Sequence, residues 1–210
     1  MKKCILFTLF IFFSLYLSAQ ESETSNFSVA GRFGLGNSNI NTQNYKNLAG
    51  SAGSFQLDVN YDLPIENNVF SYLRFGLGFQ LNSSNANLFF GSSQASLIAE
   101  TFRVPVYLNG VIRLGRDEAS LLSDTKLVAG FGGFLNHVYK YEVTDVENSA
   151  DIEKPDTGFG VIFNLGLEQD VSEHFAAFVT LDYSLMGDEN KVDEVNINTT
   201  TFNLGVRYRL

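Results

Sequence analysis

The feature that most constrains this chain is a period-two alternation of apolar and polar side chains, repeated in segments of about ten residues. In residues 55–63 every odd position is apolar and every even position is polar. Successive side chains of a β-strand point to opposite faces of its sheet, whereas an α-helix repeats every 3.6 residues. The segment therefore predicts a strand with one apolar and one polar face.

Eight segments of this kind follow one another, and in each of them nearly every position on one face is apolar. Gly31, Gly110 and Gly133 are the exceptions. Aromatic side chains stand near both ends of the apolar rows, as in the girdles of membrane β-barrels. The rows occupy residues 27–35, 55–63, 73–81, 102–112, 127–135, 159–167, 175–185 and 202–210.

The first 19 residues have the features of a secretion signal. Lys2 and Lys3 precede an apolar run at 5–17, and small residues follow it. The run is shorter than the roughly 20 residues that a membrane-spanning helix needs, so we expect cleavage after Ala19. The expected domains are a signal peptide at 1–19, a short polar leader at 20–26 and a barrel domain at 27–210.

Secretion combined with two-faced strands predicts an all-β protein, an eight-stranded antiparallel up-and-down transmembrane β-barrel in the outer membrane of a Gram-negative bacterium. A soluble barrel of the lipocalin type would place its apolar face inside. A soluble β-sandwich would need a second sheet over nearly every apolar row. Here the inner face would carry glycine and polar side chains, which suit a narrow, filled interior.

Charge and cysteine content exclude several classes of function. Removing Lys2 and Lys3 from the 14 Lys and Arg residues leaves 12, against 23 Asp and Glu residues. This balance argues against nucleic acid as a partner. The one cysteine, Cys4, lies in the predicted signal. We therefore expect neither a disulfide nor a thiolate metal site in the mature chain. We also expect no cofactor.

Charged side chains on the polar face are expected to form a structural network inside the barrel. Arg32, Asp58 and Arg74 lie on three consecutive strands at similar depth, so we expect Asp58 to sit between two guanidinium groups. Pairing with a carboxylate satisfies an arginine that would be costly to bury alone. A gated ion or proton path is the alternative interpretation. The predicted network comprises Arg32, Asp58, Arg74, Arg103, Asp182 and Arg207, with Glu168 and Arg209 on the same face.

The links between strands alternate in length, as in bacterial barrels with short periplasmic turns and longer external loops. The long links fall at 38–50, 82–96, 136–157 and 186–199, and the last two are acidic. They lack the regular spacing of a calcium-binding loop, so the first interpretation is that they are solvated acidic loops. The alternative is interaction with a partner, or weak divalent bridging to lipopolysaccharide phosphates, through Glu142, Asp145, Glu147, Asp151, Glu153, Asp156, Asp188, Glu189, Asp193 and Glu194.

Catalysis has little support in the sequence. Histidine occurs only at His137 and His174. The His and Ser two positions apart that outer-membrane lipid deacylases carry on one strand are missing. Ser184 and Ser149 could approach His137 only through the fold. We therefore predict that the protein is not an enzyme.

Pro105 is a misfit within a predicted strand, because proline cannot donate to the ladder, and it predicts a bulge or an irregular site. Three segments carry a resemblance to a known family: FRVPVYL at 102–108, LSAQ at 17–20 and FNLGVRYRL at 202–210. They resemble the Bacteroidetes-type outer-membrane β-barrel family that includes PorT-like proteins, and small OmpA-like or OmpX-like barrels. The resemblance implies an eight-stranded barrel without catalytic residues, in a family that ranges from structural proteins to parts of secretion systems.

The sequence thus predicts a monomeric barrel with a filled polar interior and a structural or surface-interaction role. Two alternatives stay open: a narrow pore or small-molecule transport barrel, and an accessory subunit of a protein secretion system. Expected partners are outer-membrane lipid and lipopolysaccharide, the barrel-insertion machinery, and an unknown surface or secretion-system protein. Many barrels end in an aromatic residue, so recognition by the insertion machinery would depend here on Tyr208 and Leu210 together.

Overall fold

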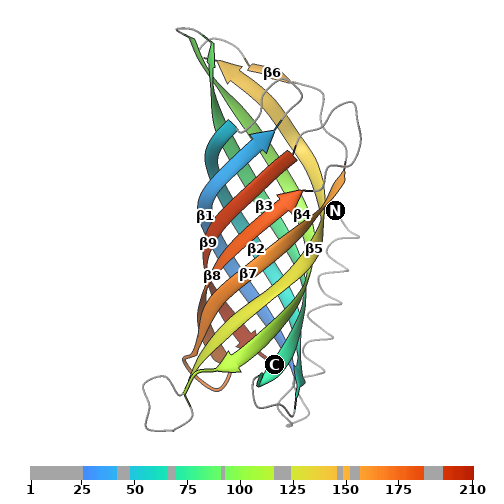
Figure 1. Ribbon diagram of the computed structural model, residues 1–210, viewed down its shortest axis with the longest axis vertical. Coiled ribbons are helices and arrows are strands. Elements are labelled where there is room, and N and C mark those ends of the chain that lie inside the picture. The colour runs from blue at the N-terminus through green and yellow to red at the C-terminus, as the bar shows by residue number, and fades with distance from the viewer. Residues whose placement is uncertain are drawn as a thin grey trace, which may run out of the picture.

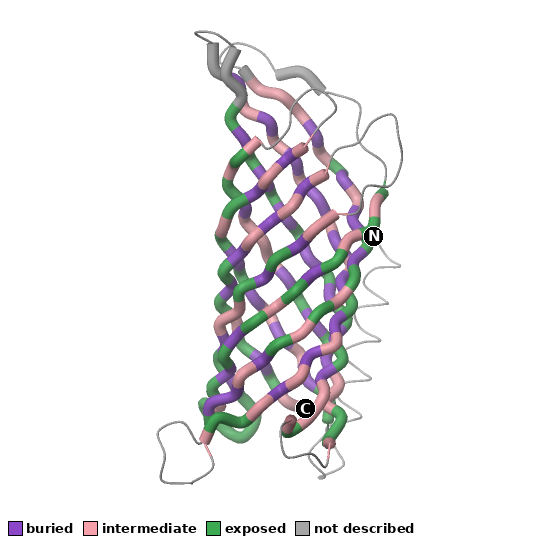
Figure 2. The backbone as a smooth tube through the Cα atoms, in the orientation of Figure 1, coloured by how far each residue is buried: buried purple, intermediate pink, exposed green. Residues whose placement is uncertain are grey.

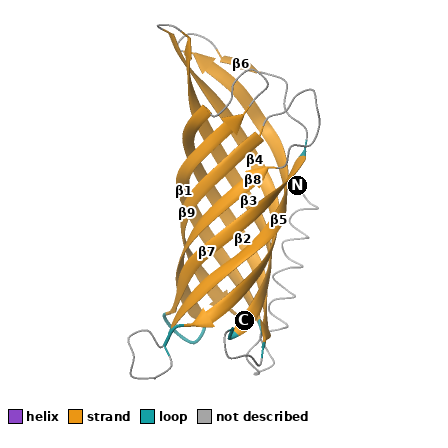
Figure 3. Cartoon of the chain, in the orientation of Figure 1, coloured by secondary structure: helices purple, strands orange, loops and turns teal. Residues whose placement is uncertain are grey.

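The chain is built almost entirely of β-strands (Figures 1 and 3). In the computed structural model it is described over residues 26–41, 48–65, 70–90, 93–115, 124–145, 149–151, 157–186 and 196–210. The strands are β1 (Phe27–Asn41), β2 (Leu48–Pro64), β3 (Tyr72–Phe90), β4 (Ser93–Arg113), β5 (Thr125–Asp145), β6 (Ser149–Asp151), β7 (Gly158–Asp170), β8 (Phe175–Met186) and β9 (Asn196–Arg209). Among these residues, no helix is long and apolar enough to cross a membrane.

The strands form one closed sheet. Strands β1 to β5 each pair antiparallel with the next, the ladder continues from β5 through β7 and β8 to β9, and β9 pairs with β1. The short strand β6 pairs only with the loop-end part of β5, in a hairpin, and is not one of the eight strands that close the barrel. The amide of Leu210 donates to the carbonyl of Phe27 at 3.1 Å, so both ends of the barrel domain lie side by side. The result is the predicted eight-stranded antiparallel up-and-down barrel, and it rules out the soluble β-sandwich.

The two ends of the barrel differ in their connections, and we name them accordingly. The turn end holds Phe27, Leu210 and the links from β2 to β3, β4 to β5 and β7 to β8 (Figure 1). The loop end holds the links that follow β1, β3, β5 and β8. The tightest connection at the turn end is 171–174, where the amides of Val171 and Ser172 both donate to the carbonyl of Phe175.

The period-two alternation sorts side chains to the two sides of the wall, and Figure 2 shows it as alternating burial along each strand. Large apolar side chains on the outer face are exposed, and Leu35 reaches 76%. Aromatic rings touch across strands at both limits of this apolar band. The ring centres of Phe27 and Tyr61 lie 4.9 Å apart, and those of Phe79 and Phe102 lie 6.0 Å apart. A band of this kind is the surface that a barrel presents to lipid.

Several strands continue well beyond the apolar band, which corrects the predicted loops. β3 runs to Phe90 and β4 begins at Ser93, so the expected loop at 82–96 is a strand hairpin (Figure 1). β5 likewise continues to Asp145 and pairs there with β6. The alternation reports only the lipid-facing length, because a strand that has left the membrane no longer needs an apolar outer face.

Pro105 interrupts a ladder without adding a residue to it. The β3–β4 register keeps the same offset on both sides, from Leu77 opposite Val106 to Gln80 opposite Arg103, with no pairs between them. Proline lacks the N–H that a ladder bond requires. The irregular site predicted at Pro105 is therefore present, but the bulge is not.

The bulge lies five residues away, between β4 and β5. Glu100 is opposite Lys140 and Thr101 is opposite Val138, so Tyr139 is the extra residue on β5. An extra residue reverses which side of the wall the following side chains face. This reversal matters for the loop end of the interior.

Candidate functional site

The inward side chains near the turn end form an ion-pair network centred on Glu168 of β7. Glu168 is fully buried, and its carboxylate lies 2.7 Å from Arg74 Nη1 and 2.9 Å from Arg207 Nε. Lys126 Nζ and Arg209 Nη2 lie 3.8 Å and 3.5 Å from it. One carboxylate is thus surrounded by four cations from β3, β5 and β9.

Two further carboxylates complete this network. Asp62 of β2 accepts bonds from Arg74 Nε and Nη2 at 2.7 Å and 3.1 Å. Asp170 pairs with Lys126 (Nζ–Oδ2 2.8 Å) and with Arg209. A buried guanidinium is costly unless its charge and its N–H groups are satisfied, so these bonds fix Arg74 across the barrel. The Glu168 cluster comprises Glu168, Asp62, Asp170, Arg74, Arg207, Lys126 and Arg209.

Further along the interior, Arg32 of β1 forms a second network, the Arg32 cluster. Its Nη1 lies 2.7 Å from Asp182 Oδ2 on β8, and its Nε lies 3.6 Å from Asp58 Oδ2 on β2. Arg32 Nη2 and Gln56 Nε2 both donate to the hydroxyl oxygen of Tyr107 at 2.6 Å. Two carboxylates here accompany one cation, the reverse of the balance around Glu168.

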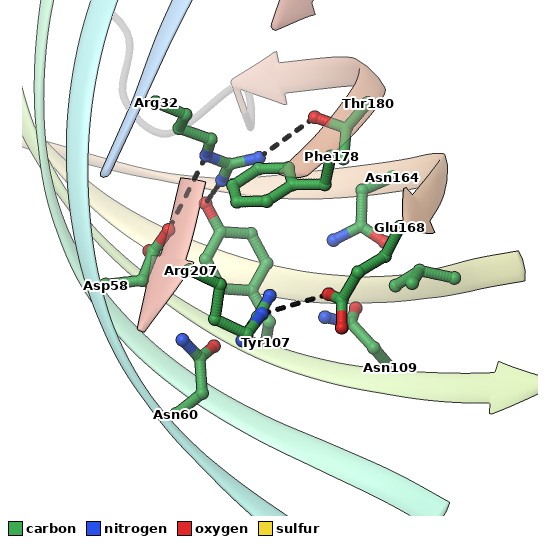
Figure 4. A pocket seen from close by; sticks show the side chains of 11 residues that line it. Arg32, Asp58, Asn60, Tyr107, Asn109, Asn164, Glu168, Phe178, Thr180 and Arg207 are labelled. Carbon is green, nitrogen blue, oxygen red and sulfur yellow. Dashed lines mark hydrogen bonds and ion pairs between the residues drawn. The ribbon is translucent and has the colours of Figure 1, made fainter. Parts of the chain in front are cut away.

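A small polar cavity lies between the two clusters (Figure 4). Its volume is about 30 Å³, room for about two water molecules. Four side-chain atoms of the lining residues have no hydrogen-bond partner among the described residues: Arg32 Nε, Asn60 Nδ2, Asn109 Oδ1 and Asn164 Oδ1. Buried water commonly satisfies such atoms, so the cavity suits water better than a larger ligand.

Closer to the loop end, Arg103 of β4 crosses the interior and meets neutral acceptors. Its Nη1 donates to Ser184 Oγ at 2.8 Å, its Nε to Asn136 Oδ1 at 2.9 Å and its Nη2 to the carbonyl of Ile197 at 3.1 Å. Its guanidinium carbon lies 4.6 Å from the ring centre of Phe134, a cation–π distance. No ion pair joins Arg103 to a carboxylate in the described part of the chain, so it stands apart from the predicted charge network.

The loop end of the interior is filled by an apolar cap. The bulge at Tyr139 turns Tyr141 inward, where unbroken alternation would turn it outward. Tyr141 lies beyond the lipid-facing band, and burial raises the pKa of its hydroxyl to about 12, so it stays neutral. All cap residues are at most 6% exposed. The cap consists of Ile40, Ala86, Ala95, Leu97, Ala99, Val138, Tyr141 and Ile197.

Three inward aromatic rings lie beside glycines of the neighbouring strand. A Cβ added at Gly160 or at Gly205 would overlap the facing ring. Glycine thus makes room for rings in a barrel whose interior is just wide enough for side chains. The pairs are Tyr107 with Gly76, Phe134 with Gly160 and Phe178 with Gly205.

The structure divides the predicted charge network and corrects its centre. Asp58 pairs with Arg32, but Arg74 pairs with Asp62 and with the buried carboxylate of β7. The register explains this: Asp62 is opposite Arg74 on β3, whereas Asp58 is opposite Gly78. Asp58 therefore does not sit between two guanidinium groups. Of the predicted residues, Arg32, Asp58 and Asp182 belong to one cluster, and Arg74 and Arg207 to the other.

The predicted network did not include Asp62, Tyr107 or Lys126. Glu168 was predicted to face inward but was not counted as a member of the network. All four occupy inward positions in the alternation, so the pattern contained a signal for them. It contained none for their partners, because Arg74 and Glu168 are 94 residues apart. The pairing across the barrel had to come from the closed structure.

The acidic residues predicted to interact with a partner are only partly described. Glu142 lies in β5 and not in a loop, and its Oε1 is 2.8 Å from Lys140 Nζ. Asp145 and Asp151 lie in β5 and β6, where the backbone alone is described. The others, Glu147, Glu153, Asp156, Asp188, Glu189, Asp193 and Glu194, lie outside the described residues.

His137 and Ser184 lie on opposite sides of the barrel wall. His137 is on the outer face, with its ring 4.9 Å from that of Phe102 and its Nδ1 3.0 Å from Thr157 Oγ1. Ser184 Oγ instead points inward to Arg103. The two therefore form no catalytic pair. Within the described ranges, no group of three or more His, Cys, Asp or Glu side chains is placed to hold a metal ion.

Comparison with known proteins agrees with this architecture. The family model described as outer membrane protein beta-barrel domain matches residues 5–209. Among solved structures, Neisserial surface protein A (NspA) is 16% identical and aligns over 90% of this chain and 100% of its own, with a TM-score of 0.53. At this identity the likeness shows the fold alone.

Two other solved structures have lower TM-scores. Ail, the attachment invasion locus protein of Yersinia pestis, is 16% identical over 88% of this chain and 99% of its own, with a TM-score of 0.40. The outer membrane protease OmpT of Escherichia coli is 10% identical over 91% of this chain and 99% of its own, with a TM-score of 0.43. No curated protein sequence matches the chain.

Proposed function

Because this chain belongs to the outer membrane protein beta-barrel domain family, and so to the outer membrane, we propose that it is a closed, non-enzymatic barrel with a structural or surface-interaction role. The observation that carries the proposal is the filling of the interior along its length. The Glu168 cluster, the Arg32 cluster, Arg103 and the apolar cap follow one another from turn end to loop end. The cavity between the first two has room for about two water molecules.

The pairing of the interior charges supports a plug better than an ion path. In the Glu168 cluster, Glu168 and Asp170 each contact at least two cations, and Arg74 is bonded to two carboxylates. Moving an ion past them would break several charge-assisted bonds at once. The apolar cap adds a second barrier, since a narrow apolar constriction excludes water and ions.

Planar-bilayer recording of the refolded protein tests the closed interior. We expect no steady conductance from the wild type and none from Asp58→Asn. A general porin in a separate bilayer of the same lipid composition is the positive control. Steady wild-type channels would overturn the proposal and favour the narrow pore. Liposome swelling in small sugars extends the test to uncharged solutes, and swelling above that of empty liposomes would favour a transport barrel.

The surface role is assigned to the loop end, which faces the outside in bacterial barrels. The segments 142–156 and 188–194 are rich in carboxylates, so a partner with a basic surface is the best match in charge. Crosslinking and mass spectrometry in intact cells would compare the wild type with a variant whose carboxylates in both segments are changed to amides. We expect crosslinks to one dedicated protein that are lost in the variant.

Three results of that experiment would point elsewhere. Crosslinks that are equal in the two proteins would remove the acidic segments from the surface role. Crosslinks lost only when divalent cations are chelated would assign those segments to bridging of lipopolysaccharide phosphates. Crosslinks to a component of a secretion machine would favour the accessory-subunit role.

Export through a cleaved signal belongs to the same proposal. The basic start and the apolar run at 5–17 support it. Protein sequenced from the outer membrane should begin at Gln20, the first residue after the expected cleavage site. A membrane-inserted chain that still begins with Met1 would contradict the signal interpretation.

A further inference from the structure

Beyond the apolar band, the outer face of β1, β2, β3 and β9 carries amide and hydroxyl groups. In these strands the described residues past the band include no Asp, Glu, Lys or Arg. We call this surface the neutral face. Its amide and hydroxyl side chains are Asn37, Asn39, Asn41, Ser51, Ser83, Asn85, Asn87, Asn196, Asn198 and Thr200.

Strand pairing places four of these side chains in one row. Asn85 is opposite Ser51, Ser51 is opposite Asn37, and Asn37 is opposite Thr200. Neighbouring strands lie about 4.8 Å apart, so the row is a continuous strip of hydrogen-bonding groups across β3, β2, β1 and β9. Asn37, Ser51 and Asn85 are exposed. The strip offers both donors and acceptors to the outside without a charge.

This composition is not a general coating of the barrel. Asparagine is depleted in β-strands, and an ordinary soluble surface carries roughly 25–35% charged residues. The opposite side follows the ordinary rule, because Glu100, Lys140 and Glu142 project from β4 and β5. Lys140 Nζ lies 2.8 Å from Glu142 and 3.8 Å from Glu100. Just past the apolar band, the outer face of β1, β2, β3 and β9 is therefore uncharged over its described residues, whereas the outer face of β4 and β5 carries charged side chains.

We propose that the neutral face binds the saccharide part of the glycolipid that surrounds the barrel in the outer leaflet. The face begins where the lipid-facing band ends, since Asn37 is the next outward residue after Leu35, and Ser83 the next after Leu81. The contact is thus continuous with the lipid interface. Sugar hydroxyls are neutral donors and acceptors, which amides and hydroxyls can pair without the cations that phosphate recognition uses. The proposal rests on the outer-membrane placement and not on the acidic segments.

Binding of a soluble glycan tests the chemistry of the face. The probe is core oligosaccharide released from lipopolysaccharide and dephosphorylated, titrated by NMR into the full chain in a nanodisc. The double substitution Asn37→Ala with Asn85→Ala should weaken binding about tenfold, because it removes two amides from the row. The matched control, Glu100→Gln with Glu142→Gln, should bind as the wild type does. Absent wild-type binding, or weakening in the control instead, would overturn the proposal.

A second experiment asks whether the glycolipid of the same membrane occupies the face. In a Cys4→Ser background, Asn37→Cys and Glu100→Cys each place one thiol at the first outward position past the band on the neutral and charged sides. Maleimide labelling would be compared in vesicles whose lipopolysaccharide has a complete core or no core sugars. We expect the complete core to slow labelling at position 37 severalfold more than at position 100. Equal slowing at both positions would mean a non-specific sugar layer and would overturn the assignment. The conductance experiment is independent of both results.

Discussion

The two halves of this barrel follow opposite rules of polarity. Toward the turn end, apolar side chains face outward and ion pairs fill the interior. Toward the loop end, polar side chains face outward, neutral on β1, β2, β3 and β9 and charged on β4 and β5, and apolar side chains fill the interior. The change occurs within single strands: on β4, Val104 and Phe102 face outward, but Ala99 and Leu97 face inward. The surroundings set the rule, because lipid requires an apolar outer face and water a polar one. One continuous sheet therefore forms a membrane barrel over its apolar band, toward the turn end. Toward the loop end it resembles a soluble barrel, with a polar outside and an apolar interior.

The ion-pair network and the apolar cap should also lose stability through different kinds of substitution. A buried ion-pair network is most sensitive to loss of one charge, since its partners are then left uncompensated. An apolar cap is most sensitive to loss of volume. The following substitutions test this difference through the free energy of unfolding in lipid vesicles, measured by urea titration.

The largest effect is expected from Glu168→Gln at the turn end. The substitution keeps the shape of the side chain but removes the charge that four cations share, so we expect a loss of about 3–5 kcal/mol. Glu173→Gln, in the exposed 171–174 turn, is the control and should change little. A Glu168→Gln barrel as stable as the wild type would show that the cluster fills space without needing its central charge.

Next in size is Leu97→Ala in the apolar cap. Deleting a buried leucine side chain leaves a cavity, and we expect a loss of about 2–5 kcal/mol, toward the lower end if the cap collapses. Its neighbour Ile98 faces outward on the same strand, so Ile98→Ala is the matched control with a smaller effect. Equal losses for both substitutions would contradict the assignment of an apolar interior to the loop end.

A smaller effect is expected where a ring and a glycine share space. Gly205→Ala should cost about 1–3 kcal/mol, because the new methyl group overlaps the ring of Phe178 and lies close to the backbone carbonyl oxygen of Gly31. Gly53→Ala is the control, since nothing lies within 4 Å of a Cβ at that position. Adding Phe178→Leu to Gly205→Ala should recover part of the loss. No recovery would mean that the close approach to the Gly31 carbonyl, and not the ring, sets the cost.

The smallest effect is expected from Tyr107→Phe in the Arg32 cluster. The change removes the oxygen that accepts bonds from Arg32 and Gln56, and we expect a loss of about 1–2 kcal/mol. Tyr61→Phe, on the outer face, removes a hydroxyl from the girdle and serves as the comparison. If Tyr107→Phe costs nothing, cavity water replaces the hydroxyl, and the interior is less tightly bonded than its distances indicate.

The alternation was sufficient to predict the membrane part of the fold, for a physical reason. In 55–63 the lipid demands an apolar side chain at every second position, so strand, face and approximate length can all be read from local sequence. Beyond the membrane that demand ends. The extension of β3 to Phe90 and the start of β4 at Ser93 are rich in Asn and Ser, and the extension of β5 to Asp145 carries several charged residues. These segments read as loops although the ladder continues.

The interior charges show the same division between local and non-local information. That Arg74, Asp58 and Glu168 face inward follows from their parity in the alternation. The parity does not show which of these side chains form ion pairs. Arg74 pairs with Asp62 through the β2–β3 register and with Glu168 across the closed barrel.

By itself, then, the sequence determined that the chain forms two-faced strands with a lipid-facing band, since each side chain must suit its solvent wherever its neighbours lie. Only the tertiary structure decided how the interior is filled. Closure of the sheet places Glu168 next to four cations. The bulge at Tyr139 directs the side chain of Tyr141 inward, where it joins the apolar cap. These contacts depend on register and on residues far apart in the chain, which a local pattern of polarity does not encode.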